Sequence, residues 1–377
     1  MLPLKPRYLF GPVDTDLAEK MVFLSGPRQV GKSTLALQLI GADHPPHPAY
    51  LNWDDVRARP RIRAGELPAG ERRIVLDEVH KYARWRGLVK GLYDTRQRGQ
   101  SFLITGSARL DVYRRGGDSL LGRYHSYRLH PLSVAELDHQ RGSVETLLRF
   151  GGFPEPLLKG SERHWQRWQR ERQDRIVRDD IRDLERIREI SLIELLIDAL
   201  PSRVGSPLSV KNLREDLEVA HDTVDRWLRI LENLYVCFRI PPLGLPKIRA
   251  VKKEQKLYLW DWSSVSEIGP RFENLVAGHL LKLCHYREDT EGKRMELRYL
   301  RDTTGREVDF VVLCDRKPLF AIEAKSGERE VSPALRYFKQ CSNIPRWYQV
   351  HLGTKDAMID GVRVLPFATL CREEAIP

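Results

Sequence analysis

Residues 26–33 read Gly-Pro-Arg-Gln-Val-Gly-Lys-Ser, and this stretch decides the fold of the N-terminal part of the chain. It matches the pattern G-x-x-x-x-G-K-[ST], whose glycines allow backbone N–H groups to surround phosphate oxygens. An apolar segment at 21–26 precedes it, and residues 32–40 follow with apolar side chains at helical spacing. The stretch predicts a phosphate-binding loop between a strand and a helix, formed by Gly26, Pro27, Arg28, Gln29, Val30, Gly31, Lys32, Ser33 and Thr34.

The loop and a second, acidic motif predict an ATP-hydrolysing site. We expect Lys32 to reach the β and γ oxygens of ATP and Ser33 to hold Mg²⁺. Residues 74–78, Ile-Val-Leu-Asp-Glu, read as a buried strand that ends in two carboxylates. Asp77 is expected to complete the magnesium shell, and Glu78 to orient and polarise the attacking water.

Two further positions are expected to act on the transferring phosphoryl group. Residues 102–107 form an apolar strand that ends in small polar residues, and Ser107, or alternatively Thr105, is expected to sense the γ-phosphate. Arg123 precedes the next predicted strand and is expected to act as a finger on the ATP of a neighbouring subunit, with Arg109 as the alternative.

The remaining pattern of this region predicts a doubly wound α/β core. Candidate strands at 49–53, 74–77, 102–105 and 124–129 alternate with helical stretches such as 85–98. With these residues in view, the N-terminal half resembles an AAA-superfamily ATPase of the prokaryotic family that carries a C-terminal domain of unknown function. The resemblance implies that Gly152 and Pro154, in Gly-Gly-Phe-Pro, begin a helical lid near the nucleotide base.

Composition indicates a globular protein of several domains that carries a basic charge. The 377 residues hold 63 Lys plus Arg against 52 Asp plus Glu, a net charge of +11 that makes DNA the first partner to consider. Five scattered cysteines favour neither a disulfide framework nor a zinc site. Without a long apolar run or an evident secretory signal, we expect a soluble, cytoplasmic protein that has no membrane partner.

Residues 209–245 predict a winged helix whose second helix spans about 223–234. Six apolar residues are expected to form its hydrophobic core: Leu213, Leu217, Val224, Leu228, Leu231 and Leu234. Thr223, Arg226 and Arg229 remain outside this set as candidate DNA contacts. A basic run follows and adds Lys252 and Lys253 as further candidates, together with Lys247, Arg249 and Lys256. Packing against protein remains the alternative for this helix.

The C-terminal region predicts a second set of carboxylates. Glu273 lies on a predicted helix, Asp309 in a strand, and Glu323 and Lys325 two residues apart in the next strand, where they share a face. The set resembles the PD-(D/E)xK nuclease motif. That resemblance implies a Mg²⁺ site at Asp309 and Glu323, with Lys325 orienting water.

These observations predict a P-loop ATPase core at 1–155, a helical lid at 156–202, a winged helix at 203–260 and a restriction-endonuclease-like α/β domain at 265–377. The leading hypothesis is an ATP-driven, DNA-binding motor or switch that forms a ring or other homo-oligomer. An ATP-gated, metal-dependent nuclease and a signalling or scaffold ATPase are the alternatives.

Overall fold

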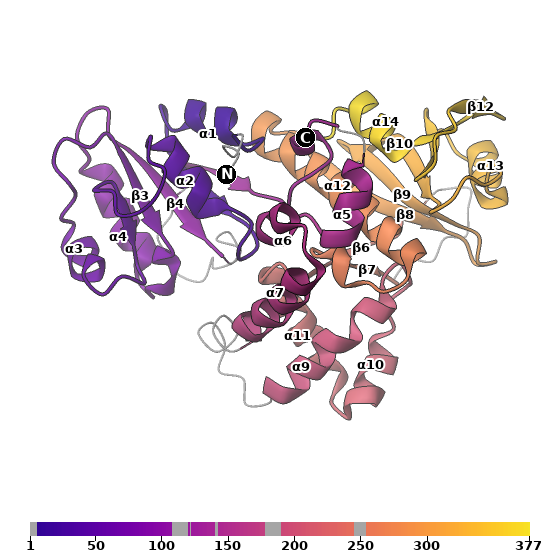
Figure 1. Cartoon of the computed structure of the whole chain (residues 1–377), viewed down its shortest axis with the longest axis horizontal. Coiled ribbons are helices and arrows are strands. Elements are labelled where there is room, and N and C mark those ends of the chain that lie inside the picture. Colours follow the sequence, from indigo (N-terminus) through magenta and orange to yellow (C-terminus); the bar gives the residue numbers. More distant parts are fainter. Residues whose placement is uncertain (1–5, 108–119, 121, 140–141, 178–189, 245–253) are drawn as a thin grey trace. The chain divides into compact units, whose positions relative to one another are not determined.

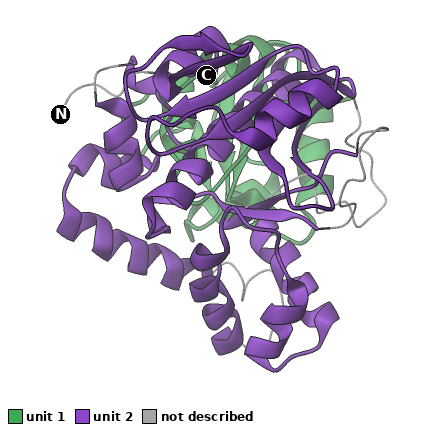
Figure 2. Ribbon diagram, turned by 90° about the vertical axis from the view of Figure 1, so that its right-hand side faces the viewer, with its two compact units in different colours: residues 1–130, 233–235 green, residues 131–232, 236–377 purple. Residues whose placement is uncertain are grey.

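The computed structural model describes residues 6–107, 120, 122–139, 142–177, 190–244 and 254–377. They form two compact units, coloured separately in Figure 2. Unit 1 comprises residues 1–130 with 233–235, and unit 2 comprises residues 131–232 with 236–377.

Unit 1 is built on a parallel five-stranded sheet in the order β2-β3-β4-β1-β5 (Figure 1). The strands confirm the predicted segments to within two residues at each end: β1 Met21–Ser25, β2 Tyr50–Asn52, β3 Arg73–Asp77, β4 Ser101–Gly106 and β5 Tyr124–Arg128. Because β4 lies between β1 and β3, the end of β4 is also placed between the ends of those two strands. Residues that follow these strands therefore meet at one edge of the sheet.

Helices cover both faces of this sheet, and the middle residues of its central strands are apolar and buried. Every residue of β1 is buried. On one face, Phe23 and Ile104 belong to a core that also contains Ile62 of α3 and Val89 of α4. The helices of unit 1 are α1 Phe10–Asp16, α2 Lys32–Leu39, α3 Ala58–Ala64 and α4 Trp85–Asp94. Helix α4 ends four residues before the predicted position, because a turn at residues 95–99 with Gly99 at φ +81° follows it.

Unit 2 begins with helices and a two-stranded hairpin. The helices are α5 Ser143–Phe150, α6 Pro154–Lys159, α7 Glu162–Arg175, α9 Ile190–Ala199, α10 Val210–Leu217 and α11 His221–Asn233. The antiparallel hairpin consists of β6 Cys237–Ile240 and β7 Lys256–Leu259. The six leucine and valine positions predicted as the core of this region are all buried. The expected order of helix, turn, helix and strand is therefore confirmed.

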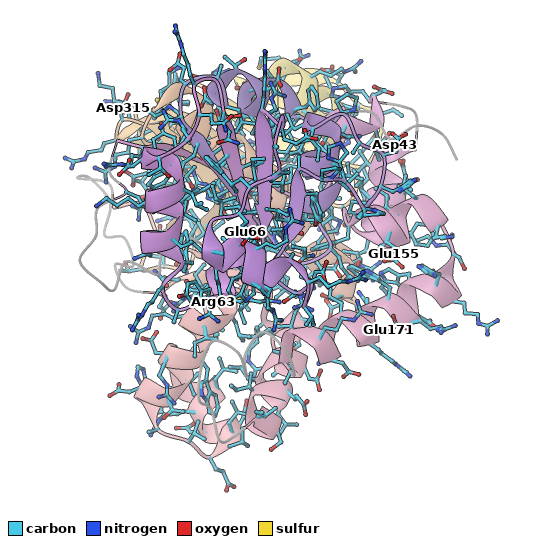
Figure 3. All side chains as sticks on the ribbon, turned by 90° about the vertical axis from the view of Figure 1, so that its left-hand side faces the viewer. Asp43, Arg63, Glu66, Glu155, Glu171 and Asp315 are labelled. Carbon is cyan, nitrogen blue, oxygen red and sulfur yellow. The ribbon has the colours of Figure 1, made fainter. Side chains whose placement is uncertain are left out.

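The exposed faces of the first helices of unit 2 carry charged side chains. Trp168 and Arg172 of α7 are buried, whereas Glu171 is exposed. Glu155 of α6 and Glu171 project from the ribbon in Figure 3. The most highly charged stretch, residues 178–188, lies outside the described residues.

The rest of unit 2 is a mixed six-stranded sheet with the long helix α12 Ile268–Glu291 (Figure 1). Its strand order is β12-β13-β11-β10-β9-β8, with β10 parallel to β11 and antiparallel to β9. The elements are β8 Met295–Arg301, β9 Glu307–Cys314, β10 Lys317–Ala324, α13 Pro333–Cys341, β11 Trp347–His351, β12 Ala357–Ile359, β13 Val362–Pro366 and α14 Phe367–Glu373. Glu273 lies on α12, Asp309 in β9 and Glu323 in β10, as predicted, whereas Lys325 directly follows β10.

Across the described ranges, no helix combines the length and apolar character needed to cross a membrane.

Candidate functional site

The phosphate-binding loop lies between the end of β1 and the start of α2, as the sequence predicts. Gly26 adopts φ +153°, and a Cβ built there would lie 2.5 Å from the carbonyl oxygen of Leu129. Any larger residue would therefore have to move the backbone after β5. Gly31, at φ +102°, caps α2, so the N–H groups at the start of α2 face the loop.

The side chain of Lys32 is held inside the loop. Its Nζ donates to the carbonyl oxygens of Gly26 at 2.9 Å and Pro27 at 2.8 Å. Lys32 is buried, and neutral carbonyls partner its ammonium group. Phosphate oxygens can replace these carbonyls as acceptors without first breaking an ion pair at these two positions.

Asp77 lies at the end of β3 and accepts hydrogen bonds from hydroxyl groups on three elements. Ser33 Oγ of α2 donates to Asp77 Oδ2 at 3.1 Å, and Tyr50 Oη of β2 donates to the same oxygen. Thr105 Oγ1 of β4 donates to Asp77 Oδ1. The structure thus brings together Ser33 and Asp77, the two predicted magnesium ligands, and their oxygen atoms suit Mg²⁺.

Glu78 follows Asp77 in the left-handed backbone region, at φ +56°. This uncommon conformation turns its side chain away from that of Asp77 and toward the end of β4. Ser107 Oγ donates to Glu78 Oε2 at 3.1 Å, and His80 Nε2 lies 3.7 Å from the same oxygen. Burial lowers the pKa of His80, which favours a neutral ring beside the carboxylate.

The two sensor candidates therefore contact different carboxylates. Thr105 donates to Asp77, whereas Ser107 donates to Glu78. The two residues are two positions apart at the end of β4, so their side chains lie on the same side of the sheet and next to each other.

Sequence reasoning missed three supporting residues in unit 1. Arg7 donates to the carbonyl oxygen of Val30 in the loop at 2.6 Å. Tyr50 contacts Asp77, and burial raises the pKa of Tyr50 above its usual value, with Asp77 adding to the effect. Tyr235 Oη donates at 2.9 Å to Ser25 Oγ, directly before the loop. Tyr50 is the first residue of β2, which pairs in parallel with β3, and the spacing of residues along the sequence gives no signal for its contact with Asp77.

Arg123 lies at the opposite edge of the sheet from the loop of its own unit. It precedes β5, which pairs in parallel with β1 so that Met21 faces Tyr124 and Ser25 faces Arg128. Its guanidinium group forms an ion pair with Asp94 of α4, with Nε 2.9 Å from Oδ1. The rival finger, Arg109, lies outside the described residues.

Gly152 and Pro154 belong to unit 2, where packing explains the glycine. A Cβ at Gly152 would lie 2.7 Å from the carbonyl oxygen of Leu132 and 2.7 Å from the Trp262 ring. Pro154 is the first residue of α6. Their proposed role near the nucleotide base stays a prediction.

The predicted DNA-contacting residues of α11 differ in their surroundings. Arg226 is exposed, and Thr223 is half-buried. Arg229 Nη2 forms an ion pair with Asp225 Oδ2 at 2.9 Å, one helical turn away. Lys252 and Lys253 lie outside the described residues, as do Lys247 and Arg249.

The inclusion of Lys256 in the basic surface run is wrong. Lys256 is the first residue of β7, and its exposed fraction is 0%. It points into the carboxylate cluster of unit 2, so it cannot present its charge to a polyanion. A lysine that alternates with Tyr258 in an otherwise apolar strand is the sequence signal that could have revealed this burial.

The predicted C-terminal residues do converge. Ile322 of β10 pairs with Phe310 of β9, which makes Glu323 and Asp309 neighbours across the two strands. The N–H of Ala324 donates to Asp309 Oδ2 at 2.9 Å, and Lys325 Nζ lies 2.6 Å from Glu323 Oε1.

Lys256 occupies the centre of this cluster. Its Nζ lies 3.2 Å from Glu273 Oε1, 3.2 Å from Asp309 Oδ1 and 2.5 Å from Glu307 Oε1. Tyr258 Oη donates to Glu273 Oε1 at 2.7 Å. Within the described part of the chain, no three His, Cys, Asp or Glu side chains are arranged to hold a metal ion.

Burial and mutual repulsion set the charge state of the cluster. Burial, followed by the charge of Asp309, raises the pKa of both Glu273 and Glu323 above the usual carboxyl range. Burial alone favours a neutral Lys256, but its acidic neighbours hold the pKa of Lys256 well above its ordinary value. Lys256 is therefore a buried ammonium group.

Family models match the chain in three segments. Residues 18–138 match the AAA domain, residues 141–268 a domain of unknown function (DUF8612), and residues 268–370 another domain of unknown function (DUF4143).

Two curated relatives are similar to the chain. An uncharacterized protein of Methanocaldococcus jannaschii is 24% identical, covering 84% of this chain and 78% of that protein. An uncharacterized protein of Mycobacterium tuberculosis is 25% identical, covering 64% of this chain and 54% of that protein. The chain thus spans about half the length of its mycobacterial relative.

Solved structures give weaker similarities. The Holliday junction branch migration motor RuvB of Thermotoga maritima is 17% identical, with a TM-score of 0.28 over 62% of this chain and 87% of that chain. A STAND protein of Pyrococcus horikoshii with a tetratricopeptide repeat sensor is 13% identical, with a TM-score of 0.30 over 75% of this chain and 46% of that chain. These TM-scores are too low to indicate a shared overall fold.

The loop, the acidic strand and the AAA match of residues 18–138 define the class of the N-terminal region. It is an AAA-type P-loop ATPase domain, the class that the sequence motifs predict.

Proposed function

We propose that this protein is an ATP-hydrolysing, AAA-type switch or motor that acts on DNA. One observation carries the ATPase part: Asp77 accepts the hydroxyl of Ser33, while the adjacent Glu78 turns aside to accept the hydroxyl of Ser107. The two carboxylates are therefore directed to different tasks, one beside the start of α2 and one beside the end of β4.

In the proposed reaction, the loop N–H groups bind the phosphates, and Lys32 exchanges the carbonyl oxygens of Gly26 and Pro27 for phosphate oxygens. Ser33 and Asp77 would hold Mg²⁺, which neutralises charge on the phosphates when bound. Glu78 orients the attacking water, and Ser107 fixes the orientation of Glu78. Thr105 holds Asp77 from the neighbouring strand.

Arg123 supports the proposed self-association. In its own unit it lies at the far edge of the sheet from the loop, so it acts on ATP only if a second copy presents it. We propose that it reaches the site of a neighbouring copy and stabilises charge on the transferring phosphoryl group.

The DNA part rests on charge and on the order of elements after residue 203. A net charge of +11 favours polyanions, and α10, α11 and the β6–β7 hairpin follow the order expected of a winged helix. Arg226, exposed on α11, is the leading candidate for a phosphate contact. In this proposal, residues 156–202 form the lid, 203–260 the winged helix and 265–377 a nuclease-like domain.

Two loop-site variants test the ATPase part. We expect Lys32→Ala to abolish nucleotide binding, because the lysine contacts phosphate. Glu78→Gln should retain binding and lower turnover by about 10²–10⁴-fold, the usual range for a group that assists proton transfer. Phosphate release and fluorescent-nucleotide binding measure the two effects. Glu66→Gln, at an exposed position of unit 1, is the matched control. Hydrolysis that is unchanged in Glu78→Gln would falsify the assignment.

The DNA part is tested by titrating duplex DNA at several salt concentrations. Arg226→Ala should weaken binding uniformly across sequences and reduce the slope of log K against log[salt] by about 1. Arg63 is an exposed arginine of unit 1, and Arg63→Ala should change neither the DNA affinity nor the salt slope. If the unmodified protein has no salt-dependent DNA affinity, the signalling or scaffold alternative replaces this part of the proposal.

A further inference from the structure

The carboxylate cluster of unit 2 already contains a cation that belongs to the chain. Lys256 Nζ contacts one oxygen each of Glu273, Glu307 and Asp309, at 3.2, 2.5 and 3.2 Å. Asp309 is one of the two predicted metal ligands, so a divalent ion held by Asp309 and Glu323 would have to lie beside this ammonium group, which is fully buried.

The position of Lys256 is fixed by backbone on both sides of β7. Lys256 pairs with Ile240 of β6, and on the other side it bridges to Pro207. The N–H of Leu208 donates to the carbonyl oxygen of Gln255 at 2.8 Å, and that of Gly205 to Leu257 at 3.2 Å. Moving Lys256 out of the cluster therefore requires breaking strand pairing.

The surroundings leave little room for another ligand. A Cβ built at Gly205 would lie 3.0 Å from Glu273 Oε2, so the backbone of this segment closes over that carboxylate. Tyr258, two residues after Lys256 on the same face of β7, donates to Glu273 Oε1. The hairpin thus supplies both a cation and a hydroxyl group to one carboxylate.

The cluster still carries an excess of acidic groups near Glu323. Glu323 is 4% exposed, and among the residues that the structure describes its Oε2 has no hydrogen-bond partner. Its other oxygen contacts Lys325. This oxygen can serve as a ligand for a divalent ion once the charge of Lys256 is removed from the cluster.

We propose that Lys256 is a built-in cation that takes the place of a divalent metal ion, and that removing its charge converts the cluster into a divalent-metal site. The cluster is then a junction between the hairpin and the six-stranded sheet, and it does not serve as a metal-dependent nuclease centre. A divalent ion and the ammonium group compete for the same oxygens, because both cannot lie between Asp309 and Glu273.

The proposed role of Lys256 does not depend on the ATP site, and the experiment measures metal binding at the unit 2 cluster separately from binding at the ATP site. The full chain is used without nucleotide in an Asp77→Asn background, which removes the proposed magnesium ligand of unit 1. Mn²⁺ binding is measured by calorimetry and by the change in thermal unfolding temperature. With Lys256 present we expect no binding that depends on Asp309. Lys256→Met should bind Mn²⁺ at least tenfold more tightly and unfold at a higher temperature when Mn²⁺ is present.

Two controls identify the site. Lys256→Arg keeps the positive charge and should gain no Mn²⁺ affinity, whereas adding Asp309→Asn to Lys256→Met should remove the gain. The inference is overturned if the chain with Lys256 binds Mn²⁺ and loses it with Asp309→Asn, or if folded Lys256→Met gains no affinity. If Lys256→Met does not fold, the proposal is still tested by comparing Mn²⁺ binding with and without Asp309→Asn in the chain that keeps Lys256.

Discussion

The ATP site of unit 1 and the carboxylate cluster of unit 2 contain similar groups in opposite arrangements. Each combines at least two carboxylates with a buried lysine. In unit 1, Lys32 donates to backbone carbonyls, and hydroxyl groups donate to Asp77 and to Glu78, whose Oε2 also lies 3.9 Å from Lys81 Nζ. In unit 2, the carboxylates hold Lys256 directly.

This difference decides whether a site can accept a charged ligand. Neutral partners such as hydroxyls and carbonyls are released at modest cost, about 0.5–1.5 kcal/mol for a typical net hydrogen bond. Breaking a buried ion pair by removing one partner costs roughly 3–5 kcal/mol. The site of unit 1 is therefore suited to exchange its partners for nucleotide and metal, whereas three carboxylates of the unit 2 cluster already hold a cation of the chain.

The largest predicted effect on turnover is that of Arg123, which we propose acts on the ATP site of a neighbouring copy of the chain. Arg123→Ala should lower turnover by about 10³–10⁵-fold, the range for arginine fingers, with nucleotide binding kept. Mixing inactive Arg123→Ala with inactive Glu78→Gln should restore activity, because each supplies what the other lacks. A mixture that stays inactive at all ratios, with assembly intact, contradicts action in trans.

A smaller effect tests the neutral hydroxyl partners of unit 1. Thr105→Val removes one donor to Asp77 while keeping the side-chain shape. Turnover should fall about 10–100-fold, because a hydrogen bond to a charged group contributes roughly 1.5–3 kcal/mol. Thr95→Val, at an exposed position after α4, is the control in steady-state kinetics. Equal activities for the two variants would show that Thr105 does not position Asp77.

The smallest effect concerns the excess charge of unit 2. The folded protein binds a proton at Glu323 more tightly than the unfolded chain, because burial and Asp309 raise the pKa of Glu323. The free energy of unfolding should therefore fall as pH rises from the ordinary carboxyl range through the raised pKa of Glu323. The fall should exceed about 1.4 kcal/mol, the value of one pKa unit.

Glu323→Gln should reduce the slope of this dependence in denaturant titrations between pH 5 and 9, because an amide does not ionise, and should leave the part that comes from the raised pKa of Glu273. Glu330→Gln, on the exposed loop after β10, should leave the dependence unchanged. A wild-type stability that rises across this range would contradict the raised pKa.

The sequence predicted the parts of both sites that are carried by local motifs. Residues 26–33 and 74–78 contain their own strand, loop and helix signals, so the loop, Asp77 and Glu78 were found where expected. The pairing of Asp309 with Glu323 followed from strand alternation and a short hairpin.

The partners that come from distant segments were not predicted. Tyr50 reaches Asp77 only because β2 pairs with β3, and strand order is not encoded by spacing. Lys256 was placed in a surface run because neighbouring lysines share its charge. Its burial depends on the pairing of β7 with both β6 and residues 204–208.

The most direct test of the comparison is the number of Mn²⁺ ions bound per chain in the presence of a non-hydrolysable ATP analogue, measured by electron paramagnetic resonance. We predict a single tightly bound ion in the wild type, kept in Asp309→Asn and lost in Asp77→Asn, because only unit 1 can exchange its partners for metal. A second ion in the wild type that is lost in Asp309→Asn would contradict the role of Lys256 as a built-in cation.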